Sequence, residues 1–94
     1  MSEAGGVRLV IHGRVQGVGY RAWLADEAQR RGVRGWVRNR REGTVEAFLH
    51  ADAAIREALI DACRRGPLAA RVREIEIAEA ADAVPDGFEQ RPTL

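Results

Sequence analysis

The sequence contains no lysine, only one cysteine and no long apolar run. All 15 of its basic residues are arginine, which excludes a lysine-based phosphate loop and a lysine Schiff base. Cys63 has no second cysteine to pair with, so an internal disulfide is excluded and a reducing compartment is favoured. No apolar stretch approaches the roughly 20 residues of a membrane span, and the N-terminus lacks the pattern of a signal peptide. We therefore expect a cytoplasmic protein that does not bind a membrane.

Charge is nearly balanced overall but unevenly distributed along the chain. Hydrophobic residues make up 46% and charged residues 31% of the sequence, which favours a folded domain over disorder. The net charge of +1 gives no overall case for binding nucleic acid. Nine arginines nevertheless lie between Arg8 and Arg41, against only Asp26 and Glu27, whereas acidic residues dominate from Glu74 onward. The first half of the chain is therefore the favoured place for an anion.

Hydrophobic periodicity predicts one domain over residues 1–94 with two helices and four main strands. The expected strands are 7–12, 33–39, 44–50 and 71–80, and the expected helices are 21–31 and 53–65. Gly32 stands where a left-handed C-cap belongs, and Asp52 is the expected N-cap of the second helix, whose apolar stripe is Ile55, Leu59, Ala62 and Cys63. A slip in the alternation near Arg73 predicts a bulge. Residues 1–6 are expected to form a loose N-terminus, and 88–91 a possible short edge strand.

The order strand–helix–strand–strand–helix–strand is that of the split βαβ, or ferredoxin-like, α+β sandwich. Right-handed crossovers place both helices on one face of a mainly antiparallel sheet, with the first and third strands as central neighbours. The same order serves RNA recognition domains, which need aromatic side chains on the third strand. Here that strand offers only Phe48, and Glu46 is expected to be exposed on the same face. A non-catalytic RNA-binding module is the alternative function.

A glycine-rich segment, "GRVQGVGYR" at 13–21, joins the first strand to the first helix. Gly17 and Gly19 allow a sharp turn that aims backbone N–H groups inward, and the helix N-terminus adds further donors. Arg21 on the first helical turn supplies a cation. The segment also fits a dinucleotide-binding pattern, but a hairpin follows the helix where that fold needs a parallel strand. On the loop alone, an anion site and a simple tight turn with a solvated Arg21 both remain open.

A second segment, "GWVRNRREGTVE" at 35–46, decides between these interpretations. Residues 13–21 match the motif G-x-V-Q-G-V-x-[FY]-R, and residues 35–46 match G-W-V-x-N-x-x-D/E-G-x-V-E. Together the two segments resemble the acylphosphatase family, and the resemblance extends over nearly the whole chain. It implies the ferredoxin-like fold and the hydrolysis of a carboxyl–phosphate mixed anhydride to a carboxylate and inorganic phosphate.

The resemblance also implies a role for each site residue. Arg21 would bind the phosphate and Asn39 would hold the attacking water. The backbone N–H groups of the phosphate-binding loop would take the remaining phosphate oxygens; this loop consists of Val15, Gln16, Gly17, Val18, Gly19 and Tyr20. The family needs no metal or cofactor. We also expect a monomer that acts on a small acyl phosphate and binds no nucleic acid. A regulatory or fused domain of the same family is a further alternative, although the length of 94 residues favours a free-standing enzyme.

Other polar residues fit structural roles better than chemical ones. His12 and His50 lie far apart without metal-ligand spacing. Cys63 falls on the apolar stripe of the second predicted helix, which is typical of a small core residue rather than a nucleophile. The sequence therefore predicts no metal site.

Overall fold

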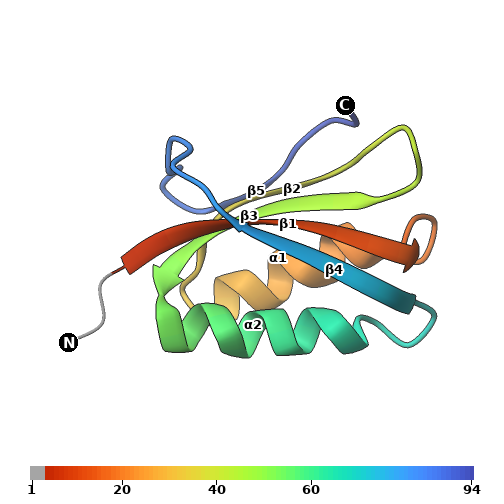
Figure 1. The fold of residues 1–94 in the computed structure, drawn as a ribbon, viewed down its shortest axis with the longest axis horizontal. Coiled ribbons are helices and arrows are strands. Elements are labelled where there is room, and N and C mark those ends of the chain that lie inside the picture. Colours follow the sequence, from red (N-terminus) through yellow and green to blue (C-terminus); the bar gives the residue numbers. More distant parts are fainter. Residues whose placement is uncertain (1–3) are drawn as a thin grey trace.

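The computed structural model describes residues 4–94 and consists of two layers, a five-stranded sheet with two helices on one of its faces (Figure 1). The strands are β1 (Ala4–Arg14), β2 (Arg34–Asn39), β3 (Val45–Asp52), β4 (Arg71–Glu79) and β5 (Phe88–Gln90), and the helices are α1 (Tyr20–Arg30) and α2 (Ala53–Arg65). The strand order is β4-β1-β3-β2-β5, antiparallel throughout except for the parallel pair β2–β5. The predicted ferredoxin-like α+β fold, with β1 and β3 at the centre, is confirmed.

The core lies between the sheet and the helices. Alternate residues of β1 point toward the helices, and Leu9 and Ile11 there are fully buried. Both helices pack their apolar stripes against this face, and Leu24 of α1 and Leu59 of α2 are also fully buried. The apolar residues that alternate along the strands and those that form the helical stripes therefore pack against each other at one interface, as the sequence predicts.

The structure agrees with the sequence at both predicted cap positions and differs at Ile55. Gly32 has φ 70°, and the N–H of Val33 donates to the carbonyl of Ala28 at 2.9 Å, which confirms the glycine C-cap. Asp52 occupies the predicted N-cap position of α2, although its side chain makes no capping hydrogen bond. Ile55 was expected on the buried stripe and is 39% exposed, because α2 buries residues closer to its C-terminal end.

Strand β1 is longer than its alternation indicates. Residues 4–6 pair with the end of β3, so the expected loose N-terminus is wrong for these residues, while 1–3 lie outside the described part of the chain. The pairing of β1 with β4 shifts register between His12 and Gly13, which leaves Arg73 as an extra residue on β4. The predicted bulge is therefore confirmed.

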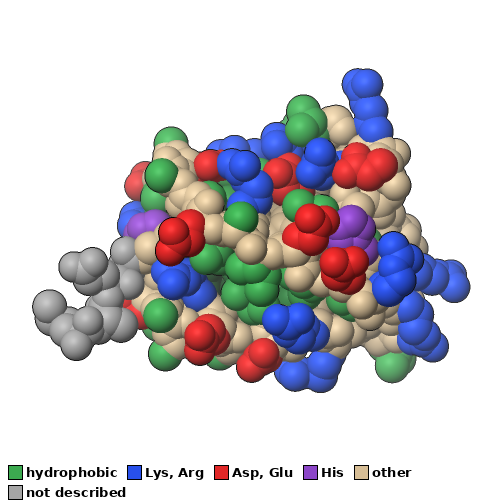
Figure 2. All heavy atoms as spheres, viewed as in Figure 1, with side chains coloured by type: hydrophobic (Ala, Val, Ile, Leu, Met, Phe, Trp, Pro, Cys, Tyr) green, Lys and Arg blue, Asp and Glu red, His purple; other side chains and the backbone are tan. Residues whose placement is uncertain are grey.

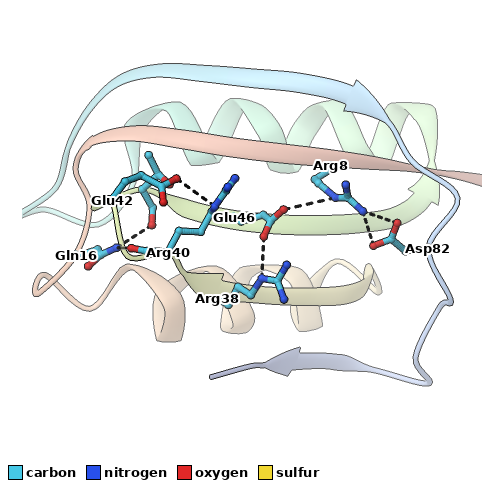
Figure 3. A network of polar contacts seen from close by, with 8 residues as sticks. Arg8, Gln16, Arg38, Arg40, Glu42, Glu46 and Asp82 are labelled. Carbon is cyan, nitrogen blue, oxygen red and sulfur yellow. Dashed lines mark hydrogen bonds and ion pairs between the residues drawn. The ribbon is translucent and has the colours of Figure 1, made fainter. Parts of the chain in front are cut away.

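The face of the sheet that the helices leave open carries a polar network (Figure 3). Glu46 accepts a hydrogen bond from Nε of Arg38 at 2.7 Å and forms an ion pair with Arg8 at 3.6 Å. Arg8 in turn donates to both carboxylate oxygens of Asp82, at 2.6 and 2.8 Å. Glu46 is only 5% exposed. The expectation that Glu46 is exposed is therefore wrong, since arginines from both neighbouring strands cover it.

The two aromatic side chains on this open face are also covered. Phe48 is fully buried and Trp36 is 2% exposed. The guanidinium carbons of Arg38 and Arg91 lie 4.6 and 5.0 Å from the centre of the Trp36 ring. A Cβ added to Gly6 would come within 2.6 Å of the Phe48 ring. Base stacking needs an accessible ring face, so this geometry disfavours the RNA-binding alternative.

Candidate active site

The loop between β1 and α1 is shaped by two glycines. Gly17 and Gly19 have φ values of 73° and 77°, in the left-handed region. A Cβ added at either position would meet nothing within 4 Å, so these glycines serve the backbone conformation rather than close packing. Gly19 is also the N-cap of α1, and it has no side chain to occupy the free N–H groups of the first turn. Those N–H groups remain available to an anion.

The side chain of Gln16 ties this loop to the β2–β3 hairpin (Figure 3). Its Nε2 donates to the carbonyl oxygens of Arg40 and Thr44, each at 2.8 Å. The hairpin turn is closed by a hydrogen bond from Gly43 N–H to the Arg40 carbonyl at 3.1 Å. Asn39 immediately precedes that turn, so Gln16 fixes the loop relative to the end of β2.

The loop, the start of α1 and the end of β2 enclose a cleft of about 160 Å³. Its walls are formed by Val15, Gln16, Gly17, Gly19, Tyr20, Arg21, Ala22, Asn39 and Gln90. The structure thus brings together all the predicted site residues except Val18, whose side chain packs against the core instead. Within residues 4–94, Arg21 forms no ion pair with a carboxylate, and the Asn39 side chain makes no hydrogen bond. Both polar groups are free to bind a ligand.

Tyr20 anchors the start of α1, where the loop ends. It is buried, and its hydroxyl donates to the carbonyl oxygen of Cys63 at 2.7 Å, which anchors the first residue of α1 to α2. Burial raises the pKa of the Tyr20 hydroxyl, so it keeps its proton at neutral pH. Burial likewise raises the pKa of the Cys63 thiol to about 12, which rules out a thiolate nucleophile there.

The end of the sheet next to this loop is basic. Arg14, the last residue of β1, lies opposite Arg71 of β4, and both are exposed. Arg65 at the end of α2 is exposed at the same end of the molecule, where Figure 2 shows arginine side chains gathered at the right. Such a field attracts an anionic substrate toward the loop.

Two larger hollows, of about 510 and 370 Å³, lie elsewhere in the molecule, and both are lined by Val7 and Arg56. Their charged walls mix bases with acids such as Glu79 and Asp61, and neither includes a glycine loop that opens a helix. No group of three or more potential ligands among residues 4–94 is arranged to hold a metal ion. The smaller cleft is therefore the better candidate site, since a guanidinium, an amide and helix N–H groups converge there.

The family model for acylphosphatases matches residues 7–90 of the chain, the same span that holds the loop and Asn39. The chain belongs to the acylphosphatase family. An acylphosphatase of Azorhizobium caulinodans is 59% identical over 81 residues, which are 86% of each chain. The solved acylphosphatase of Coxiella burnetii superposes with a TM-score of 0.89 at 25% identity, covering 94% of this chain and 93% of that one. That of Bacillus subtilis gives 0.87 at 29% identity, covering 95% and 99%.

Membership in the acylphosphatase family identifies the chain as a hydrolase of acid anhydrides that acts on acyl phosphates. No helix within residues 4–94 has the length and apolar character needed to cross a bilayer.

The sequence motifs did not reveal that Gln90 lines the same acylphosphatase cleft. Its place depends on the parallel pairing of β5 with β2, which sets Gln90 opposite Val37. The only available signal was the short strand predicted at 88–91.

Proposed function

We propose that this acylphosphatase hydrolyses acyl phosphates by binding the phosphoryl group in the loop at 15–20 and attacking it with a water held by Asn39. The observation that carries this proposal is the shared cleft, in which the loop, Arg21 and Asn39 form the walls of one space of about 160 Å³. Phosphoryl transfer depends mainly on positioning and charge stabilisation, and a guanidinium, an amide and backbone N–H groups in one cleft can supply both.

Arg21 is proposed to hold the phosphoryl oxygens. Its planar guanidinium can donate two parallel hydrogen bonds to one phosphate, and no carboxylate among residues 4–94 competes for it. Backbone N–H groups of the loop and of the first turn of α1 take the other oxygens, and they stay bound as charge develops in the transition state. The positive φ values of Gly17 and Gly19 set the loop in the shape that makes this possible.

Asn39 is proposed to orient the attacking water. Its amide can donate an N–H to the water oxygen or accept a water O–H, but it cannot act as a base. The water oxygen forms a bond to phosphorus, the bond from phosphorus to the acyl oxygen breaks, and a phosphoryl oxygen takes the proton. Because a carboxylate leaves readily, no general acid is needed. No histidine or carboxylate among residues 4–94 lines the cleft, which fits this chemistry.

The proposal includes three finer points about the enzyme. It works as a monomer on small acyl phosphates, without a metal, a cofactor or nucleic acid; the side chains that line the cleft suit a phosphoryl group and a water. The site releases inorganic phosphate, which it also binds as a product. The buried free thiol of Cys63 suits the reducing cytoplasm.

The test combines turnover with a map of the phosphate site. We expect hydrolysis of benzoyl phosphate or acetyl phosphate, but not of an alkyl phosphate monoester, because a carboxylate leaves without protonation whereas an alkoxide does not. ATP serves as a second control. Inorganic phosphate should compete with substrate and shift the amide NMR signals of residues 15–21. Saturating phosphate that leaves those amides unmoved would place the anion elsewhere.

A further inference from the structure

Gln90 occupies the cleft wall next to Asn39. In the parallel pair β2–β5, Gly35 lies opposite Phe88 and Val37 lies opposite Gln90. Phe88 and Val37 are both buried in the core on the helix side of the sheet. Side chains alternate along a strand, so Gln90 points to the same side as Phe88, at the end of the sheet where the core gives way to the cleft.

The backbone around Gln90 is fixed while its amide is free. The N–H of Arg91 donates to the Val37 carbonyl at 2.8 Å, and the N–H of Leu94 donates to the Asn39 carbonyl at 3.1 Å. These bonds hold residues 90–94 alongside β2. The Gln90 side chain itself makes no hydrogen bond to any residue between 4 and 94. Gln90 is exposed, and its amide, carried on a fixed backbone and without an internal partner, lines a polar cleft.

The position of Gln90 in the sheet indicates what this amide contacts. Asn39 lies two residues beyond Val37 on the same side of β2, which makes it the diagonal neighbour of Gln90. Arg21, on the first turn of α1, lines the same cleft from the helix layer. In an in-line displacement, the attacking water and the leaving group lie on opposite sides of phosphorus. Because Gln90 lies on the strand next to Asn39, it lies on the side proposed here for the attacking water.

We propose that Gln90 holds the attacking water jointly with Asn39; this rests on the proposed role of Asn39. A water molecule has two lone pairs and two O–H groups. One lone pair accepts an N–H of Asn39, and the other attacks phosphorus. One O–H donates to the Gln90 carbonyl oxygen, and the second points at the phosphoryl oxygen that receives its proton as the acyl oxygen leaves. With both amides in place, all four positions around the water oxygen are specified.

The test compares Gln90→Leu with Glu89→Ala. Leucine keeps much of the side-chain volume and cannot hydrogen-bond. Glu89 is the adjacent residue on β5, and it points to the opposite side, where it pairs with Arg91 at 3.2 Å. We expect Gln90→Leu to lower kcat about 3- to 10-fold, the effect of one uncharged hydrogen bond, with KM and the inhibition constant of inorganic phosphate within twofold of wild type. Glu89→Ala should leave all three constants unchanged. Gln90→Ala, which removes the amide together with most of the side chain, should reproduce the loss in kcat.

A double-mutant cycle separates a shared water from two independent effects. On an Asn39→Ala background, Gln90→Leu should lower kcat by less than twofold, because the water has already lost its position. A full additive loss would overturn the proposal. So would a rise in KM that is larger for benzoyl phosphate than for acetyl phosphate, which would place Gln90 against the acyl group. Wild-type kcat in both Gln90 variants refutes this inference alone, whereas wild-type kcat in Asn39→Ala refutes the proposed function beneath it.

Discussion

Replacing Gln16 with methionine tests whether the loop and the hairpin must be tied together. Methionine matches glutamine in length and volume but cannot donate to the carbonyls of Arg40 and Thr44. Each carbonyl keeps one backbone partner, from Gly43 and from Arg40 respectively, so neither is left without a hydrogen bond. The cost is therefore that of two ordinary hydrogen bonds, about 1–2 kcal/mol together in this half-exposed place. In a domain of this size, that lowers Tm by roughly 5–15 °C.

The effect on activity should exceed the effect on stability. Gln16 joins the proposed phosphate loop to the turn after Asn39, and a shift of about 1 Å between reacting groups can cost about 100-fold in rate. We expect Gln16→Met to lower kcat about 10- to 100-fold at a temperature where the variant is fully folded. Urea unfolding, thermal unfolding and steady-state hydrolysis of benzoyl phosphate measure both effects.

The control for Gln16→Met is Gln29→Met, on the exposed surface of α1 where the glutamine makes no side-chain hydrogen bond within residues 4–94. Gln29→Met should match wild type in both stability and kcat. If Gln16→Met is as stable and as active as Gln29→Met, the tie has no influence on the site and the reasoning is refuted.

Three further predictions concern the metal, the polar network and the thiol. Hydrolysis should continue in excess chelator, and activity that is lost there and restored by Mg²⁺ or Zn²⁺ would show a metal requirement. Glu46→Gln should lower the free energy of unfolding by about 1–3 kcal/mol in urea titrations, since Arg38 and Arg8 lose a buried carboxylate; the exposed control Glu89→Gln should stay within about 0.5 kcal/mol of wild type. The Cys63 thiol has a pKa of about 12 when folded and 9.0 ordinarily, so the unfolded chain loses this proton first and the free energy of unfolding falls as the pH rises from 9 toward 12. Between pH 8 and 10, the free energy of unfolding of Cys63→Ala should therefore fall by up to about 1.4 kcal/mol less than that of the wild type. Equal pH dependence of unfolding in the variant and the wild type would contradict this.

Local patterns predicted the parts of the fold that depend on local chemistry. The C-cap at Gly32 and the bulge at Arg73 follow from backbone preferences within a few residues, and the structure has both. The loop and Asn39 were also identifiable, because motifs of contiguous residues carry them. The structure adds that the loop and Asn39 line one cleft.

What the sequence did not reveal depends on contacts between distant segments. Glu46 is buried because Arg8 and Arg38 reach it from the neighbouring strands, and Arg8 is held by Asp82, 74 positions away. A polar residue in an alternating strand is ordinarily exposed, so nothing local indicates this burial. Gln90 enters the site only through the parallel register of a three-residue strand, and so short a strand carries almost no periodicity.

The most direct test of the central claim compares phosphate binding with turnover in Arg21→Ala and Asn39→Ala, after circular dichroism has shown that both are folded. Arg21→Ala should weaken inorganic phosphate binding and also lower kcat, because its charge contacts the phosphoryl group throughout the reaction. Asn39→Ala should bind phosphate nearly as tightly as wild type while kcat falls on the order of 100- to 1,000-fold, the usual cost of one preorganised donor. Wild-type kcat in Asn39→Ala, or wild-type phosphate affinity in Arg21→Ala, would contradict the assignment of water to one residue and phosphate to the other.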